Sequence, residues 1–264
     1  TWTVINTGTN QTFYSISFAN PNRGWAVGSG GTIWYYNGSG WSSQNVNSGI
    51  TFYKIHAIGN TAYAVGTNGT VCKYVNGAWT AINPGVGNTF YAVHFTSETV
   101  GYIAGSGGII CRTTNGGVSW TPLTSGTTKD LKCIKTACPS EAIVAGDSGV
   151  VLTTTNRGAS WTNRNLNQDI NINSVIWSEG SGYLVGENGN AFSFTFGGQA
   201  DQLSISPNSP VSFCPGTSVD LTASGSYNYL WSTGDTSRTI TVTTPGTYRV
   251  RNGNGICADS AEVS

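Results

Sequence analysis

Alternating apolar and polar residues run along most of the chain, in short segments separated by Gly, Asn and Ser. Residues 13–18 read Phe-Tyr-Ser-Ile-Ser-Phe, and residues 90–95 read Phe-Tyr-Ala-Val-His-Phe. A period of two is typical of strands that bury one face. Because the residues that favour long helices are scarce, the pattern predicts an all-β fold.

One phrase recurs five times in the first 198 residues. Each copy ends on a glycine that we call the marker glycine, and successive marker glycines lie 38, 39, 41 and 40 residues apart. The copies are Trp25-Ala-Val-Gly28, Tyr63-Ala-Val-Gly66, Tyr102-Ile-Ala-Gly105, Ile143-Val-Ala-Gly146 and Tyr183-Leu-Val-Gly186. A second glycine stands three residues after each marker glycine, so the spacing indicates a structural repeat.

Each repeat is predicted to contain a tight hairpin. The second glycine and the residue before it, as in Asn68-Gly69, tolerate the positive φ angles that a two-residue type I′ turn requires. An alternating segment precedes the hairpin, and a second turn follows it. That turn leads to a tryptophan in the first four repeats: Trp41, Trp79, Trp120 and Trp161. Four short strands in about 40 residues are the unit of a β-propeller blade.

The fifth repeat lacks the tryptophan expected near residue 200, whereas Trp2 lies 39 residues before Trp41. We therefore expect the strand over residues 1–6 to complete the fifth blade, built with residues 171–198, and so to close the ring. The prediction is a five-bladed β-propeller over residues 1–198. An open solenoid is the alternative, but it needs capping repeats, and Trp2 fits a blade.

The outer turns of the third and fourth repeats resemble a known motif. They read Thr113-Thr-Asn-Gly-Gly-Val-Ser-Trp120 and Thr154-Thr-Asn-Arg-Gly-Ala-Ser-Trp161, similar to the Asp-box (BNR repeat) of sialidase-type propellers with Asn in place of Asp. In that family the box is a structural turn, remote from catalysis. With the marker-glycine phrase, the repeats look like those of the photosystem II stability/assembly-factor family, whose propellers usually have seven blades.

Residues 203–264 form a second predicted domain, because composition changes near residues 197–200. Its phrases Tyr229-Leu-Trp-Ser-Thr-Gly234 and Pro245-Gly-Thr-Tyr-Arg-Val250 resemble the small immunoglobulin-like modules in surface proteins of gliding and adhesive Bacteroidetes. The resemblance implies a small β-sandwich. A domain of this size gains from a staple, and a Cys214–Cys257 disulfide would stabilise it by about 2–4 kcal/mol.

Composition and charge limit the classes of function that the chain can have. Only 9% of the residues are charged and 12 basic side chains balance 12 acidic ones, so the electrostatic footprint of a nucleic-acid binder is missing. No apolar run predicts a transmembrane segment. Six cysteines with low charge favour an oxidising, extracellular location, although six buried thiols would also account for them. A Cys133–Cys138 bridge is a further candidate, since both residues are expected to flank a turn in the fourth blade.

Candidate catalytic groups are few. Asp147 and Glu187 follow the marker glycines of adjacent repeats, so they are either a carboxylate pair on one face or two solvated turn residues. His56 and His94 occupy equivalent inner-strand positions, but Lys135 holds that position in the fourth repeat, which argues against a metal site. We expect no catalytic residue, no metal and no cofactor, and hence no enzyme.

A ring of equivalent residues offers a binding surface. These residues stand near the starts of the inner strands, where we expect the mouth of the propeller channel: Tyr14, Tyr53, Tyr91, Lys132 and Asn173. Tyrosine combines a flat apolar face with a polar tip, which suits a sugar or a peptide. Packing between blades is the alternative role. Asp147 and Glu187 complete the candidate ligand-binding residues.

These observations predict a secreted or cell-surface protein that binds a protein or glycan without catalysis, as in adhesion. One alternative is a lectin with sugar sites between blades. Another is an assembly factor, or a subunit of a larger surface complex or filament. A glycoside-acting enzyme that uses Asp147 and Glu187 is the last alternative. The chain begins at Thr1 with neither an initiator methionine nor a signal peptide, which is typical of a processed or engineered start.

Overall fold

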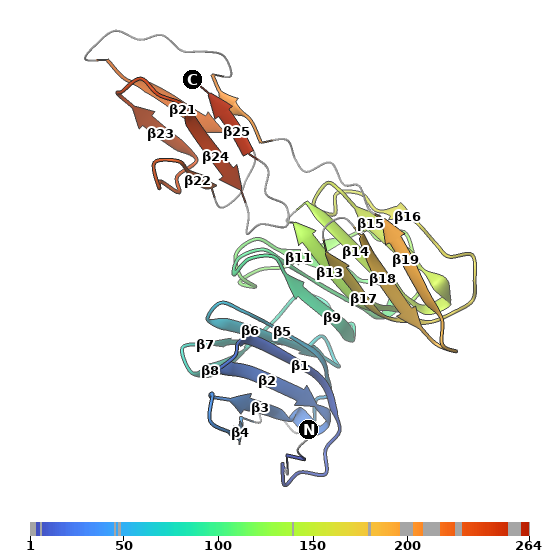
Figure 1. Ribbon diagram of the computed structural model, residues 1–264. Coiled ribbons are helices and arrows are strands. Elements are labelled where there is room, and N and C mark those ends of the chain that lie inside the picture. Colours follow the sequence, from blue (N-terminus) through green and yellow to red (C-terminus); the bar gives the residue numbers. More distant parts are fainter. Residues whose placement is uncertain are drawn as a thin grey trace.

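The structure is a computed structural model that describes residues 4–5, 7–44, 46, 49–138, 140–178, 181–195, 203–207, 217–224, 229–252 and 260–263. In this part of the chain the secondary structure is almost entirely strand, with three short 3-10 turns: Ser29–Gly31, Ser106–Gly108 and Asp147–Gly149. The predicted all-β class is confirmed. Figure 1 shows the successive sheets in chain order, coloured from blue to red. No described helix is long and apolar enough to cross a bilayer.

The first four repeats each form a four-stranded antiparallel sheet with strands in chain order. The first sheet contains β1 (Phe13–Asn20), β2 (Arg23–Gly28), β3 (Ile33–Tyr36) and β4 (Trp41–Ser43). The second contains β5 (Phe52–Ile58), β6 (Thr61–Gly66), β7 (Val71–Val75) and β8 (Ala78–Ile82). The third contains β9 (Phe90–Phe95), β10 (Gly101–Gly105), β11 (Ile110–Thr113) and β12 (Thr121–Leu123). The fourth contains β13 (Leu131–Cys138), β14 (Glu141–Gly146), β15 (Val151–Thr154) and β16 (Thr162–Asn163).

The fifth repeat forms a sheet with three described strands, β17 (Ile172–Ser178), β18 (Ser181–Gly186) and β19 (Ala191–Thr195). Two further antiparallel sheets follow. One contains β20 (Ile205–Ser206), β21 (Val219–Ala223) and β23 (Thr239–Val242), and the other contains β22 (Tyr229–Trp231), β24 (Tyr248–Asn252) and β25 (Ser260–Val263). These two sheets share one apolar core with Trp231 buried in it, and Nε1 of Trp231 donates to the carbonyl of Ser237 at 2.9 Å.

The hairpin of each repeat has the backbone geometry predicted from its residues. Both central positions have positive φ in all five repeats, and the N–H of Thr32 donates to the carbonyl of Ser29 at 3.1 Å in the first. The marker glycine is needed for another reason. A Cβ at Gly105 would lie 2.0 Å from the carbonyl oxygen of Thr89, because the start of the inner strand passes directly against it.

Hydrophobic cores lie between consecutive sheets. Each sheet presents a trailing face to the next sheet and a leading face to the preceding one. At the first interface, Trp25 and Val27 of the trailing face pack on Phe52 and Ile55 of the next leading face. The same arrangement recurs at the second, third and fourth interfaces. The inner strands consequently lie in series, β1 against β5, β5 against β9, β9 against β13 and β13 against β17.

The outer turns that resemble an Asp-box are built around asparagine. Oδ1 of Asn115 accepts a hydrogen bond from the N–H of Ser119 at 3.0 Å and another from Oγ1 of Thr113 at 3.0 Å. Asn156 holds the turn of the fourth sheet in the same way. The hydroxyl of Tyr63, in the second sheet, donates to a carbonyl of the third sheet's turn at 3.0 Å. These turns therefore fasten neighbouring sheets together.

The bridge predicted between Cys133 and Cys138 is wrong. Cys133 is a free, buried thiol whose Sγ donates to the carbonyl of Ala145 at 3.6 Å. Both cysteines belong to β13, because that strand continues to Cys138 before it turns. Five residues of extended chain separate two Cα atoms by about 16 Å, whereas a disulfide requires less than about 7 Å.

The described N-terminal residues do not form the predicted closing strand. Val4 and Ile5 belong to no strand, and Ile5 lines a hollow on the first sheet with Phe13 and Trp34. An apolar side chain is stabilised by lying against an apolar face, and the first sheet offers one. Three residues on which other predictions depend lie outside the described residues: Trp2, Cys214 and Cys257.

Candidate functional site

Three tyrosines form a row along the starts of the inner strands. The ring centroids of Tyr14 and Tyr53 are 5.6 Å apart, and those of Tyr53 and Tyr91 are 5.2 Å apart. Lys132 extends the row, since its Nζ lies 3.9 Å from the centroid of the Tyr91 ring in a cation–π contact. We call these four residues the tyrosine row. Four of the five residues that the repeat places in one ring thus contact each other in chain order.

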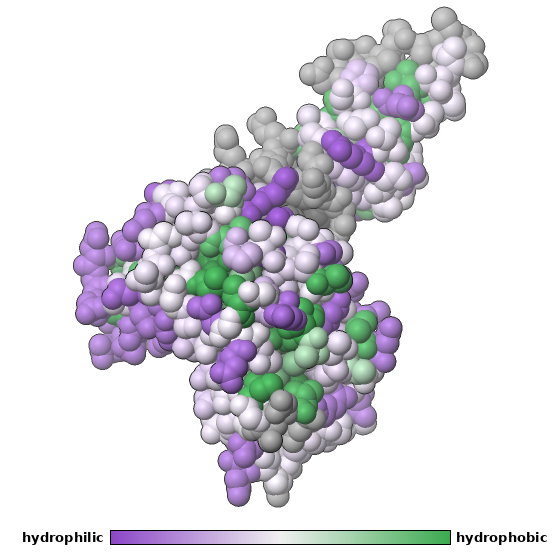
Figure 2. All heavy atoms as spheres, turned by 180° about the vertical axis from the view of Figure 1, so that it is seen from behind, coloured by the Kyte–Doolittle hydropathy of each residue, from purple (hydrophilic) through white to green (hydrophobic). Residues whose placement is uncertain are grey.

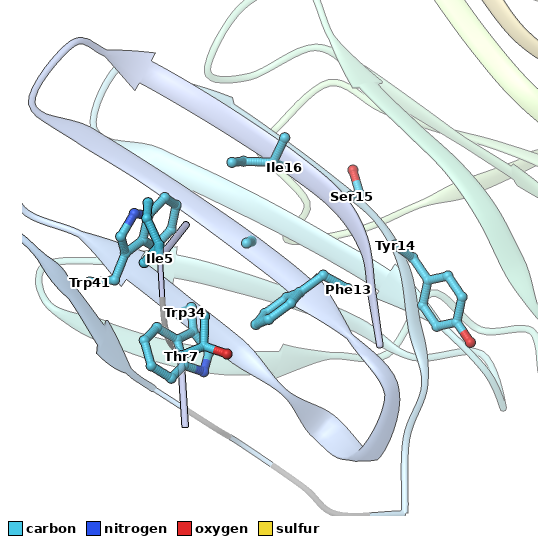
Figure 3. A pocket seen from close by; sticks show the side chains of 9 residues that line it. Ile5, Thr7, Phe13, Tyr14, Ser15, Ile16, Trp34 and Trp41 are labelled. Carbon is cyan, nitrogen blue, oxygen red and sulfur yellow. The ribbon is translucent and has the colours of Figure 1, made fainter. Parts of the chain in front are cut away.

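Each residue of that ring is the extra residue of a β-bulge. The register between β5 and β6 skips Tyr53. It also skips the equivalent residues of the other four sheets: Tyr14, Tyr91, Lys132 and Asn173. A bulge re-aims the side chain of its extra residue. Figure 3 shows the result for Tyr14, which points away from Phe13 and Trp34 on the same sheet.

Lys132 ends the row between two carboxylates. Its Nζ lies 3.1 Å from Oδ2 of Asp130 and 3.6 Å from Oδ2 of Asp147. Partial burial opposes the charge of Lys132, but the hydrogen bond to Asp130 and the proximity of Asp147 outweigh it and raise the pKa of the lysine. The cation at this end of the row is therefore neutralised within the protein.

A second group of side chains lies three residues further along the same strands. The rings of His56 and His94 have centroids 4.5 Å apart, and Nζ of Lys135 lies 2.9 Å from Nε2 of His94. Nδ1 of His94 lies 2.6 Å from Oγ1 of Thr136. Lys54 acts electrostatically on both histidines and on Lys135. We call Lys54, His56, His94 and Lys135 the basic cluster.

Burial and positive charge keep both histidines of the basic cluster neutral. Desolvation, followed by the charge of Lys135, lowers the pKa of His56 to about 4. Desolvation and the neighbouring His56 and Lys135 hold the pKa of His94 well below its ordinary value. A neutral imidazole has one donor and one acceptor, so the Lys135 ammonium donates to Nε2 of His94, and Nδ1–H donates to Thr136.

The two lysines of the basic cluster have no anionic partner among the described residues. Burial, and then the charge of Lys54, lower the pKa of Lys135, and no described ion pair includes either lysine. The cause is visible in the strands themselves. None of the five inner strands contains Asp or Glu, whereas they hold three lysines and both histidines of the chain.

The other predicted ligand residues have separate partners. Asp147 pairs with Lys132, whereas Oε1 of Glu187 accepts a hydrogen bond from Nδ2 of Asn171 at 3.1 Å. The two carboxylates therefore have different partners in the described part of the chain. Asn173 is exposed at the bulge of β17.

Sequence reasoning identified the equivalence of His56, His94 and Lys135 but missed the basic cluster. Lys54 lies two residues before His56 and has no counterpart in the equivalent positions of the other repeats, so the repeat pattern does not point to it. The signal was available: a comparison of the inner strands shows lysine or histidine on three adjacent strands and no carboxylate on any of them.

Comparisons with known proteins test the family resemblance of the repeats. A family model described as Photosynthesis system II assembly factor YCF48 matches residues 71–178. The structure of YCF48 from Cyanidioschyzon merolae has a TM-score of 0.58 and 15% identity, and the alignment covers 97% of this chain and 96% of that one. A structure of YCF48 bound to D1 peptide has a TM-score of 0.41 and 15% identity, over 73% of this chain and 96% of that one. No curated protein matches the chain.

These comparisons confirm part of the resemblance predicted from the repeats. The likeness to the Cyanidioschyzon merolae protein shows a shared fold, and the family match supports the resemblance over residues 71–178. Neither comparison shows an immunoglobulin-like fold for residues 203–264.

Proposed function

We propose that this chain is a non-catalytic β-propeller that binds an extended peptide segment of a partner protein across the tyrosine row and the basic cluster. The five sheets are its five blades, and residues 203–264 are a separate immunoglobulin-like domain. The observation that carries the proposal is the tyrosine row, in which four consecutive blades present side chains in mutual contact from equivalent bulges.

The tyrosine row has the properties of a peptide-binding surface. Tyrosine supplies a large contact area with few rotatable bonds, so little conformational entropy is lost when a ligand packs on it. Ring-to-ring contacts hold Tyr53 between its two neighbours, while Tyr14 keeps half of its surface exposed. Phenolic hydroxyls at the edges of the rings can hydrogen-bond to a peptide backbone.

The basic cluster favours a peptide that carries carboxylate groups. His56, His94 and Lys135 lie three residues along their strands from the tyrosine row, and Lys54 directly follows Tyr53. Three residues of strand span about 10 Å, which a short extended peptide can cover. Lys54 and Lys135 have no anionic partner among the described residues, so an incoming carboxylate would supply the ion pair they lack. Lys132 is less available because Asp130 and Asp147 already neutralise it.

The location and biological setting of this binding are also proposals. Low charge and the resemblance of residues 203–264 support a secreted or cell-surface protein, acting in adhesion or as a subunit of a larger surface assembly. Glycan binding is the second candidate, because sugars also stack on tyrosine. A neutral glycan would use the tyrosine row without the lysines of the basic cluster, and this difference separates the two candidates.

The test compares matched peptides. An array of random peptides rich in Asp and Glu is probed with the full chain, beside a copy of the array with Asn and Gln at those positions and beside a glycan array. We expect acidic peptides to bind and their amide counterparts to fail. Peptides that bind are then titrated by fluorescence anisotropy, and we expect the Tyr53→Ser/Tyr91→Ser variant to lose at least about tenfold in affinity.

Two further variants isolate the role of charge. Lys135→Gln should weaken binding of the acidic peptides, whereas Lys129→Gln, at an exposed position before β13, makes the same change in net charge and should not. Full affinity in the Tyr53→Ser/Tyr91→Ser variant would refute the site. Binding of glycans in the absence of any peptide binding would refute the peptide ligand.

A further inference from the structure

The trailing face of the last repeat differs from its four counterparts in exposure. The residues one and three positions before each marker glycine form the centre of a trailing face. In the first four sheets the next sheet covers these residues completely. They are no more than 2% exposed in these sheets: Trp25, Val27, Tyr63, Val65, Tyr102, Ala104, Ile143 and Ala145. The equivalent Tyr183 and Val185 of the fifth sheet are 59% and 45% exposed. No described sheet therefore covers the same side-chain pattern in the fifth sheet.

The leading face of the first sheet is the complementary case. Ile55, Val93 and Ile134 occupy one repeat position, contact the preceding sheet and are at most 7% exposed. The equivalent residue of the first sheet is Ile16, which is 60% exposed. Phe18, two residues further along β1, is also exposed. Figure 2 shows clusters of apolar side chains at the surface, with weakly polar and hydrophilic ones around them.

A hollow of about 400 Å³ lies on this leading face (Figure 3). Its lining includes Phe13, Ile16, Ala26, Trp34 and Trp41 of the first sheet, and Ile5 from the residues that precede it. Four of these positions correspond, repeat by repeat, to Phe52, Ile55, Ala64 and Cys72 of the second sheet, which pack against Trp25 and Val27. The hollow therefore lies on a leading face of the kind that packs against a preceding sheet at each of the four internal interfaces.

We propose that a second copy of this chain occupies the hollow, with the trailing face of its fifth sheet on the leading face of the first sheet. Tyr183 and Val185 of one copy take the place that Trp25 and Val27 take at the first interface. The two free faces do not meet within one chain, because both are exposed in the same structure. Ile5 does not fill the hollow either, since it remains 61% exposed.

The contact is head-to-tail. Because the two participating faces differ, each copy keeps one free face after the contact forms, and copies add until a ring closes. Burial of large apolar side chains provides the driving force, as it does at the four internal interfaces. This proposal does not rest on peptide binding, although Tyr14 of the tyrosine row also lines the hollow.

Sedimentation velocity over a range of protein concentrations tests the proposal. The full chain is expected to sediment as a species heavier than one copy, with a mass that rises with concentration. Ile16→Asp removes the leading face and Tyr183→Asp the trailing face, and each should give a monomer. Val118→Asp introduces the same charge at a position that is 79% exposed on an outer turn, and it should associate like the unmodified chain.

Mixing the two monomeric variants is the decisive measurement. The Ile16→Asp copy retains its trailing face and the Tyr183→Asp copy its leading face, so one contact can form between them. We expect the mixture to give a dimer and no larger species. Because both substituted positions are exposed, we expect each variant to fold, and near-ultraviolet circular dichroism checks this. The proposal is overturned if the unmodified chain is a monomer or if the mixture of variants stays monomeric. An unmodified chain in which the first and fifth sheets pack against each other would be a monomer.

Discussion

Nζ of Lys135 lies 2.9 Å from Nε2 of His94, so a lysine cation donates its hydrogen bond to a neutral imidazole. Protonation of His94 would remove the acceptor and place two positive charges in contact. His56 lies on the other side of the same imidazole, with a centroid separation of 4.5 Å. The arrangement thus depends on both histidines remaining unprotonated.

Acid should weaken the fold through these histidines. The pKa of about 4 for His56 in the folded chain lies below the value near 6.5 expected in the unfolded chain, and that of His94 is also lowered. Between these values the unfolded chain binds more protons, so the free energy of unfolding decreases as the pH falls. The full histidine contribution is present above about pH 6.5. Urea unfolding midpoints measured from neutral pH down to pH 4 should show this decline.

A variant without histidines provides the control for acid unfolding. His56 and His94 are the two histidines of the chain, so His56→Gln/His94→Gln removes every imidazole. We expect a flatter profile between neutral pH and pH 5, with the remaining loss at lower pH caused by carboxylate protonation. An unchanged slope would contradict the assignment.

The marker glycines should not tolerate alanine. A Cβ at position 105 would meet the carbonyl oxygen of Thr89 at 2.0 Å, and backbone cannot move as a flexible side chain can. Gly105→Ala should therefore lower the free energy of unfolding by about 3 kcal/mol. Gly87→Ala is the matched control, because a Cβ there meets nothing within 4 Å. Equal urea midpoints for the two variants would contradict the close-approach argument.

Asn115 should accept aspartate but not alanine. Its Oδ1 accepts from the N–H of Ser119, while its Nδ2 donates to Oγ of Ser119 at 2.9 Å. In Asn115→Asp the serine hydroxyl can reverse and donate to the carboxylate, so little stability is lost. Asn115→Ala removes these two bonds together with the one from Oγ1 of Thr113, and it should cost about 1–2 kcal/mol in thermal or urea unfolding. A larger loss for aspartate than for alanine would refute this role.

Three described thiols should be inert in the folded chain. Burial raises the pKa of Cys72 and Cys111 to about 11 and that of Cys133 to about 12. Because the thiolate is the reactive species, iodoacetamide at neutral pH should leave these residues unmodified and should label them after urea is added. Peptide mass spectrometry reads the result residue by residue. Rapid labelling of Cys133 under native conditions would show that it is not enclosed as described.

Local chemistry made much of the fold predictable. Gly28, Gly66 and their equivalents recur because the backbone of the inner strand lies too close to leave room for a Cβ. Residue pairs such as Asn68-Gly69 recur because both positions have positive φ. Both requirements can therefore be recognised in the sequence. The tyrosine row was predictable for a related reason. A bulge recurs at one position of every repeat, so Tyr53 and Tyr91 share an environment.

Other features depend on where a strand ends or on what covers a face. The sequence around Cys133 and Cys138 does not reveal that β13 continues through both residues. Ile16 and Ile55 look equivalent in the repeat, yet one is exposed and the other is 3% exposed, because only the second has a preceding sheet. The basic cluster was missed because it combines side chains of three strands, none of which is unusual alone.

The placement of the cores between sheets has a consequence for how the molecule unfolds. Each core contains residues from two successive repeats, so unfolding of one repeat exposes part of the core of the next. The stability of each repeat therefore depends on its direct neighbours, as in a one-dimensional array of repeats. The third sheet has a neighbour on either side, whereas the first and fifth have one each. Fraying should therefore begin at the ends, and amide hydrogens in β9 and β10 should exchange last.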